Sequence, residues 1–193
     1  MWIKICGNTS LEDAQMAVES GANALGFVFA SSPRQVTEGQ AGRIVSRLPA
    51  GVDTFGVFVD EDFATILRAV TECGLTGVQL HGRSDGKFIA HLRETFAGIG
   101  RRVRVVCVVR RRMEQNGQQD ANGSEVQAGG EADFDQELAR CSRNPAVDAV
   151  LVDTWVAKAQ GGTGSSFDWQ SARTSFRQAA QGKIGRASCR ERV

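Results

Sequence analysis

Two residues that could carry out acid–base chemistry stand at the ends of short apolar runs. Residues 3–6 (Ile-Lys-Ile-Cys) end in a thiol, and residues 150–153 (Val-Leu-Val-Asp) end in a carboxylate. Short apolar runs of this kind are typical of parallel strands, and the ligands of parallel sheets sit at the carboxyl ends of strands. Cys6 and Asp153 are therefore the first candidates for a catalytic pair.

The two groups would need opposite shifts in pKa. A free thiol has a pKa of about 8.5, so it needs a lowered pKa to act as a base near neutral pH. Lys4 shares a strand face with Cys6 and could lower it, whereas Ile3 and Ile5 would then face the helices. A carboxyl group that donates a proton needs a raised pKa, which burial supplies. The residues alone leave open that Cys6 is a small buried hydrophobic side chain and that Asp153 only caps a loop or a helix.

Three further features could bind or transfer charge. Arg34 follows a proline in the loop after residues 24–29 and could hold a carboxylate bidentately, although a solvated arginine is the commoner case. His81 ends the run 77–81 and could be a base, with a packed structural histidine as the alternative. The loop Gly161-Gly162-Thr163-Gly164 could cradle a phosphate with its N–H groups, but it fits neither the P-loop nor the dinucleotide fingerprint.

Six strand–helix units are expected to position these residues. Helix starts are predicted at Thr9 with Glu12, at Thr37 with Gln40, at Asp60 and at Ser84, because each residue can act as an N-cap. The alternation of strands and helices with short turns predicts a wholly parallel α/β sheet, and periodicity leaves open a doubly wound sheet or a closed barrel. The predicted strands are 2–6, 24–29, 54–59, 77–81, 103–109 and 148–153, and the last predicted helix is 133–142.

Two regions lack this alternation. Residues 111–132 are polar and have no apolar period, so they are predicted to be an exposed, disordered loop. Residues 184–193 show no strand or helix pattern and resemble the translation of a sequencing adapter, so a domain over 1–183 with a non-native tail is expected. The arginines at 101, 102, 104 and 110–112, which flank the fifth strand, are predicted to be a solvated surface.

The composition excludes several classes of protein. The chain has 193 residues, of which 41% are apolar, and a net charge of +1, which gives no field for nucleic acid. No apolar stretch is long enough to span a membrane. The five cysteines form no CxxC pair and there are only two histidines, so a zinc site is not expected. A reducing cytoplasm is the simplest expectation.

Six motifs, in order along residues 2 to about 170, resemble the phosphoribosylanthranilate isomerase family of tryptophan biosynthesis. Any one of them would be a weak signal, whereas the ordered set is specific. They are Lys4-Ile-Cys-Gly-Asn-Thr9, Gly26-Phe-Val-Phe29 with Ser32-Pro-Arg34, Gly56-Val-Phe-Val59, Val78-Gln-Leu-His-Gly82, Leu151-Val-Asp153, and Gly161-Gly-Thr-Gly164 with Phe167-Asp-Trp169.

The resemblance implies a TIM barrel that catalyses an Amadori rearrangement of N-(5-phosphoribosyl)anthranilate, without metal or organic cofactor. It implies that Asp153 is the general acid that opens the ribose ring and that Cys6 is the general base that removes the C2 proton. Arg34 would hold the anthranilate carboxylate, and the loop Gly161–Gly164 would close over the substrate. His81 has no catalytic role in this comparison.

The chain departs from the family pattern in two places. The loop formed by residues 111–132 is longer than the corresponding loop of the family. Strands seven and eight, whose loops supply the phosphate site in the family, are absent. We therefore expect a C-terminally truncated barrel of about six units that folds poorly and is nearly inactive. Some relatives are fused to indole-glycerol-phosphate synthase. The sequence leaves open whether the enzyme also accepts the related substrate of the histidine pathway. A phosphate-ligand binding protein, another phosphosugar barrel enzyme and a thiol redox protein are the alternative classes.

Overall fold

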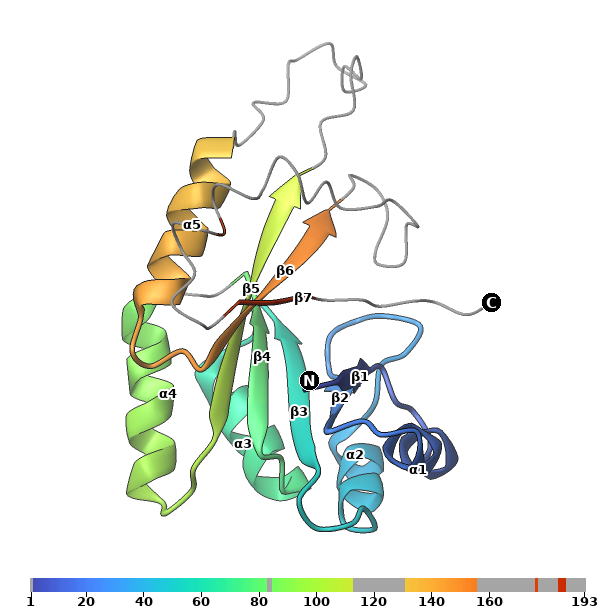
Figure 1. Cartoon of the computed structure of the whole chain (residues 1–193). Helices are drawn as coiled ribbons and strands as arrows, with labels where there is room; N and C mark the ends of the chain where they lie inside the picture. Colours follow the sequence, from blue (N-terminus) through green and yellow to red (C-terminus); the bar gives the residue numbers. More distant parts are fainter. Residues whose placement is uncertain (1, 83–84, 113–130, 156–175, 177–183, 187–193) are drawn as a thin grey trace, which may run out of the picture.

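The computed structural model describes residues 2–82, 85–112, 131–155, 176 and 184–186. These residues form a parallel sheet of seven strands in the order of the sequence, which curls so that the helices cover its outer side (Figure 1). The elements are β1 (Lys4–Cys6), α1 (Leu11–Glu19), β2 (Ala24–Val28), α2 (Glu38–Val45), β3 (Asp53–Val59), α3 (Phe63–Cys73), β4 (Gly77–His81), α4 (Gly86–Gly98), β5 (Arg104–Arg112), α5 (Glu131–Arg143), β6 (Ala149–Trp155) and β7 (Ile184–Arg186).

The register of the sheet determines which side chains share a face. Partners in adjacent parallel strands point to the same side, and alternate residues of one strand do so as well. Cys6 pairs with Gly26, Gly26 with Phe55, and Phe55 with Gly77. Ile3 and Ile5 point to the opposite, helix-bearing side as expected. They are nevertheless exposed, because β1 is an edge strand and no described helix covers them.

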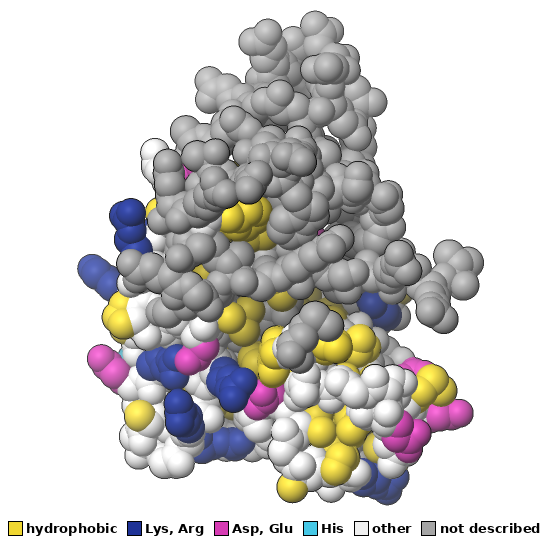
Figure 2. Space-filling model, viewed as in Figure 1, with side chains coloured by type: hydrophobic (Ala, Val, Ile, Leu, Met, Phe, Trp, Pro, Cys, Tyr) yellow, Lys and Arg dark blue, Asp and Glu magenta, His cyan; other side chains and the backbone are white. Residues whose placement is uncertain are grey.

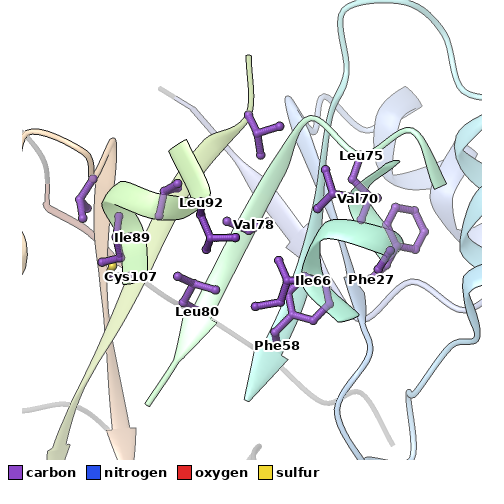
Figure 3. Packing of buried hydrophobic residues seen from close by; sticks show 14 of the residues in the cluster. Phe27, Phe58, Ile66, Val70, Leu75, Val78, Leu80, Ile89, Leu92 and Cys107 are labelled. Carbon is purple, nitrogen blue, oxygen red and sulfur yellow. The ribbon is translucent and has the colours of Figure 1, made fainter. Parts of the chain in front are cut away.

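The hydrophobic core lies between the outer face of the sheet and the helices. Its largest fully buried side chains include Phe27 and Phe58 from the strands and Ile66 and Leu92 from the helices (Figure 3). A second, small cluster of Ala24, Phe55 and Val106 fills the inner face near the amino ends of the strands. The core therefore supports the sheet from outside and leaves the carboxyl ends of the inner face for polar side chains.

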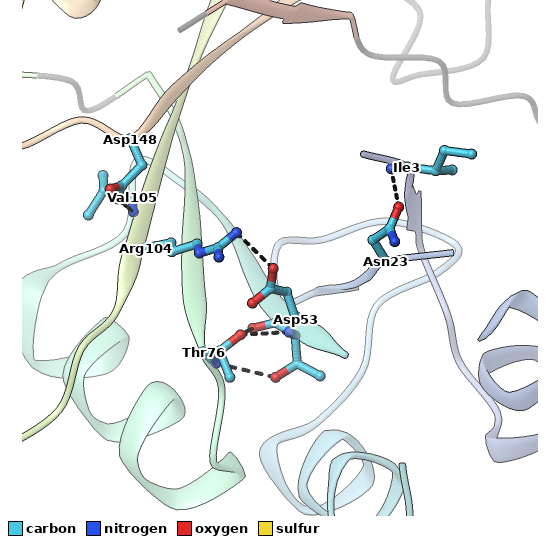
Figure 4. Close-up of polar contacts among 8 residues, drawn as sticks. Ile3, Asn23, Asp53, Thr76, Arg104, Val105 and Asp148 are labelled. Carbon is cyan, nitrogen blue, oxygen red and sulfur yellow. Dashed lines mark hydrogen bonds and ion pairs between the residues drawn. The ribbon is translucent and has the colours of Figure 1, made fainter. Parts of the chain in front are cut away.

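Polar contacts hold the amino ends of the strands together (Figure 4). Asp53 of β3 accepts from Arg104 of β5 at 2.8 Å, and Thr76 Oγ1 accepts from the Thr54 N–H at 2.7 Å. Asp148 accepts from the N–H of Val105 at 2.7 Å and forms an ion pair with Arg93 of α4. These side chains fix the strands at the end remote from Cys6 and Asp153.

The charged side chains do not form a large field of one sign. Figure 2 shows Lys and Arg side chains interspersed with Asp and Glu on the visible face, in keeping with the net charge of +1. None of the described helices is long and apolar enough to cross a membrane.

One of the predicted helix starts is confirmed in detail. Thr37 Oγ1 accepts from the Gln40 N–H at 3.2 Å while Gln40 Oε1 accepts from the Thr37 N–H at 2.9 Å, a complete capping box for α2. The predicted cap at Thr9 is wrong by one residue. Ser10 is the N-cap of α1 and accepts from the Asp13 N–H, because its backbone is extended at the point where the helix begins.

The remaining helix starts also shift along the chain. Asp62, and not Asp60, caps α3 by accepting from the Thr65 N–H at 2.8 Å. Asp60 instead has a φ of 49°, a left-handed conformation that Asp tolerates better than most residues. Asp85 caps α4, although Ser84 was predicted to start it.

Regular structure extends into both regions that were predicted to lack it. β5 continues to Arg112 and α5 begins at Glu131, so the ends of the predicted loop 111–132 are regular, and residues 113–130 lie outside the described part. The prediction that residues 184–193 contain no strand is wrong for Ile184–Arg186, which pair with β6. Backbone groups make this pairing, so it needs no apolar pattern. The domain bounds and the origin of the tail stay predictions.

We expect Thr37→Ala to lower the free energy of unfolding by about 1 kcal/mol, because the side-chain half of the capping box is lost. Thr37→Ser keeps the hydroxyl and should leave stability close to that of the parent chain. Urea unfolding followed by circular dichroism measures both. Equal loss in the two variants would contradict the capping role.

Candidate active site

Cys6 and Asp153 lie on the same inner face of the sheet. The paired residues Cys6, Gly26, Phe55, Gly77 and Arg104 of successive strands all point to this face. Arg110 lies six residues after Arg104 in β5, so it points to the same face, and it pairs with Asp153 of β6. Cys6 ends β1, and Asp153 lies in the carboxyl half of β6. Both residues are partly exposed, so a ligand at this edge of the sheet can reach them.

Gly26 makes room for Cys6 and Lys4 above β2. A Cβ atom at position 26 would lie 2.7 Å from Cys6 Sγ and 2.7 Å from Lys4 Nζ, so both side chains occupy the space that any larger residue would need. Lys4 Nζ also lies 5.9 Å from the centre of the Phe55 ring. The structure thus places the ammonium group and the thiol above the same glycine, on the strand face that parity predicted.

The backbone after Cys6 is held by a buried asparagine. Asn8 is 4% exposed, and its amide donates to the carbonyl oxygens of Ile5 and Gly26 at 3.0 and 3.2 Å. The N–H groups of Gly7 and Asn8 also donate to Gly26 O. Sequence reasoning missed this positioning role, although Asn8 lies inside the first family motif and a polar residue next to Gly was a usable signal.

Arg34 reaches the end of β1 from the loop after β2. Its Nη1 donates to the carbonyl oxygen of Cys6 at 3.3 Å, and its guanidinium covers Gly7 so closely that a Cβ there would lie 2.7 Å from Nη1. Gly7 has a φ of 84°, which favours glycine for a second reason. The structure therefore brings together two predicted site residues, Cys6 and Arg34, that are far apart in sequence.

The other described cysteines differ from Cys6. Cys73, Cys107 and Cys141 are buried, whereas Cys6 is half-buried. Burial raises the pKa of the Cys73 thiol to about 11. A hydrogen bond with Cys141, together with burial, raises the pKa of Cys107. These groups behave as core side chains, which leaves Cys6 as the reactive thiol candidate of the described residues.

His81 occupies the inner face at the carboxyl end of β4. Burial, the charge of Arg110 and the charge of Lys4 lower its pKa to about 3, so the imidazole is neutral near pH 7. Its Nδ1 lies 3.3 Å from Arg110 Nη2, and its Nε2 lies 2.9 Å from the Gln79 side-chain nitrogen. Such a ring is a poor general base, which agrees with the absence of a catalytic role in the predicted site.

Arg110, one of the arginines around β5, reaches the inner face near the carboxyl end of that strand. It is exposed, as predicted, but it contacts His81 and pairs with Asp153 across the sheet. Its alternation with Val106 and Val108 in the sequence indicated that the three side chains share one strand face. Only the register of the sheet shows which residues Arg110 lies beside. The predicted loop Gly161–Gly164 lies outside the described residues, and no cluster of metal-binding side chains occurs within the described ranges.

A curled, helix-covered parallel sheet with a thiol and a carboxylate on its inner face defines an enzyme of the TIM-like α/β class. The family described as N-(5'-phosphoribosyl)anthranilate (PRA) isomerase matches residues 3–107. The chain belongs to this family, and the function that it encodes is that of PRA isomerase in tryptophan biosynthesis. The predictions of the family, of an isomerase and of the fold class are confirmed.

Two relatives illustrate how much of the family the chain spans. It is 39% identical over 171 residues to the PRA isomerase of Pelobacter propionicus, which covers 88% of this chain and 67% of the relative. It is 36% identical over 170 residues to that of Bacillus cereus strain B4264, with 88% and 68% covered. Both relatives therefore extend beyond the matched part.

Solved structures support the same fold. The PRA isomerase of Thermotoga maritima has a TM-score of 0.73 at 30% identity, covering 97% of this chain and 77% of that one. A PRA isomerase in complex with reduced 1-(o-carboxyphenylamino)-1-deoxyribulose 5-phosphate has a TM-score of 0.66 at 29% identity, covering 93% and 71%.

Gly26→Ala tests the close approach of Cys6 and Lys4. Because the added methyl group has no space, we expect the free energy of unfolding to fall by about 1–3 kcal/mol. The matched control is Gly39→Ala in α2, where the nearest atom is 3.6 Å from the added Cβ and stability should be unchanged or slightly higher. Chemical denaturation measures both. A stable Gly26→Ala variant would contradict the crowded geometry.

The buried neutral state of His81 predicts a dependence of stability on pH. Unfolded histidine has a pKa of about 6.5, so from there down to about 3 the unfolded chain binds a proton that the folded chain does not. The contribution is complete above about pH 6.5 and is lost as pH falls, at no more than about 1.4 kcal/mol per pH unit. Unfolding at several pH values should show this slope.

His81→Asn should flatten the slope, whereas His91→Asn on the exposed face of α4 should not. The chain has only two histidines, so ring NMR signals can be assigned by these variants. A His81 ring that titrates near pH 6.5 would contradict the effect of burial and of the Arg110 charge on this ring.

Proposed function

We propose that Asp153 and Cys6 are the general acid and the general base of an Amadori rearrangement of N-(5'-phosphoribosyl)anthranilate. Asp153 donates a proton to the ribose ring oxygen, and the C1–O bond breaks to give an iminium ion. The Cys6 thiolate then removes the C2 proton, which leaves an enolamine. Tautomerisation of the enolamine gives the ketone, so one proton enters at oxygen and one leaves carbon.

The placement of both groups on one inner face is the observation that carries this proposal. In this proposal, a substrate at the carboxyl edge of the sheet contacts Cys6, which ends β1, and Asp153, in the carboxyl half of β6. Lys4 beside the thiol supports the base, because a nearby positive charge favours the thiolate. A reaction that needs one group of each kind, without a metal in its scheme, is consistent with this arrangement.

Arg34 is proposed to hold the anthranilate carboxylate. Its guanidinium lies against the Cys6–Gly7 backbone and keeps further donors for a bidentate contact. The ligand named for the related complex, a reduced carboxyphenylamino-deoxyribulose phosphate, has both a carboxylate and a phosphate. We propose that this chain takes a substrate of the same type and that the loop Gly161–Gly164 covers it.

We also propose that the enzyme works in the cytoplasm. The four described cysteines form no disulfide bond, which supports this proposal. No nucleic-acid or membrane partner is part of this proposal. A partnership with indole-glycerol-phosphate synthase, as in some relatives, stays a prediction.

The test is genetic complementation of a tryptophan auxotroph that lacks the isomerase. Two forms are compared: the 193-residue chain and an extended chain, which adds the C-terminal part of the Pelobacter propionicus relative beyond the match. Rescue is expected from the extended chain, and Cys6→Ala or Asp153→Asn should abolish it, since loss of a general acid or base costs about 10²–10⁴-fold in rate. The expectation that the short chain is nearly inactive is tested in parallel.

Asp135→Asn, an equal change at an exposed position of α5, is the control and should rescue like the parent. Circular dichroism confirms that each variant is folded. Full rescue by both Cys6→Ala and Asp153→Asn would refute the assigned roles.

A further inference from the structure

The polar wall formed by Gln79, His81 and Arg110 has no part in the chemistry proposed above. Gln79 and His81 alternate along β4, and Arg110 comes from the adjacent strand β5. All three lie on the inner face, and Arg110 pairs with Asp153 of β6. The group therefore lies directly beside the proposed general acid.

The chemistry of the contacts fixes the proton on His81. A guanidinium only donates hydrogen bonds, so Nδ1 of His81, at 3.3 Å from Arg110 Nη2, must be the acceptor. The neutral ring then carries its proton on Nε2 and donates it towards Gln79. The Gln79 amide meets this donor with its oxygen when the group is turned by 180°, a rotation that exchanges two atoms of nearly equal shape.

In either orientation of the amide, one atom of the Gln79 side chain faces His81 and the other has no hydrogen-bond partner among the described residues. Gln79 is 5% exposed, and its Oε1 is buried without a hydrogen-bond partner among the described residues. A buried polar atom without a partner is costly, so its retention on the inner face points to a ligand or water that completes it. The wall thus combines an unfilled hydrogen-bonding position with a fixed cation.

We propose that Arg110, positioned by His81, binds an oxyanion of the substrate on the β4–β5 side of the inner face. His81 suits this task because a neutral acceptor orients the guanidinium without adding or cancelling charge. Arg34 comes from the loop after β2, so the two arginines approach the inner face from separate strands. The oxyanion is a carboxylate or a phosphate, since the proposed substrate carries both, and the inference rests on that proposal.

The position of Arg110 also explains how a cation can stand beside a general acid. A guanidinium directed at Asp153 would favour the carboxylate and weaken it as an acid. The hydrogen bond to His81 Nδ1 directs Nη2 of the guanidinium towards β4. Removal of His81 therefore affects both anion binding and the pH at which Asp153 works.

The test measures ligand binding to the full chain, with anthranilate and ribose 5-phosphate as separate probes by titration calorimetry. Arg110→Gln should weaken one of the two by about tenfold or more, because a charge-assisted hydrogen bond is lost. Loss with anthranilate alone identifies the carboxylate, and loss with ribose 5-phosphate alone identifies the phosphate. Arg102→Gln, an equal charge change at an exposed position before β5, should leave both unchanged.

His81→Leu removes the acceptor and should weaken binding of the same probe. Arg110→Lys keeps the charge, so its affinity should lie between those of the parent and of Arg110→Gln. The double variant Arg110→Gln/His81→Leu should be little worse than Arg110→Gln, since the two residues act as a unit. NMR provides a second readout, in which Arg110→Gln raises the pKa of the His81 ring.

Unchanged binding in Arg110→Gln, or a parent chain that binds neither probe, would overturn the proposal. An unchanged His81 titration in Arg110→Gln would overturn the pairing. Binding involves no turnover, so failure here is distinguishable from failure of the acid–base roles of Cys6 and Asp153.

Discussion

Backbone hydrogen bonds between parallel strands hold alternate side chains of β1 to β6 on one inner face, and the site depends on this register. A slip of one residue in β6 would turn Asp153 towards the helices. The hydrophobic core between the helices and the outer face of the sheet stabilises this register. The hydrogen bonds of Asp53, Arg104 and Asp148 stabilise it at the amino ends of the strands. Stability is thus concentrated at the amino ends and the outer face, which leaves the carboxyl ends free to carry unsatisfied and charged groups.

The polar residues of the inner face differ in charge from strand to strand. At β1, the side chains of Lys4 and Cys6 both lie over Gly26, where the absence of a side chain makes room for them. At β4, burial keeps His81 neutral. Burial and neighbouring charges, and not the strand geometry, therefore favour His81 in its uncharged form. An acid, a base and anion-binding groups can therefore coexist within one small surface.

The strand ends and the alternation of side chains were predictable because they are local properties. Cys6, Asp153 and Lys4 were found by position within short runs, and Arg34 by its place after a proline in the loop that follows a strand. Helix starts were less certain, since neighbouring acceptors compete. Asp60 and Asp62 both precede α3, and only the backbone conformation selects Asp62. The contact between His81 and Arg110 joins two strands, so it needs the register, which no single run contains. β7 is held by backbone pairing and left no apolar signal.

The most direct test of the central claim, that the thiol of Cys6 takes the proton from C2, uses substrate with deuterium at C2 of the ribose. Single-turnover reactions of the extended chain would be followed with this substrate and with ordinary substrate, for the parent and for Cys6→Ser. The parent should react more slowly with the deuterated substrate and release deuterium to solvent, and Cys6→Ser should release it far more slowly. Equal rates of deuterium release in the parent and in Cys6→Ser would show that another group removes the proton.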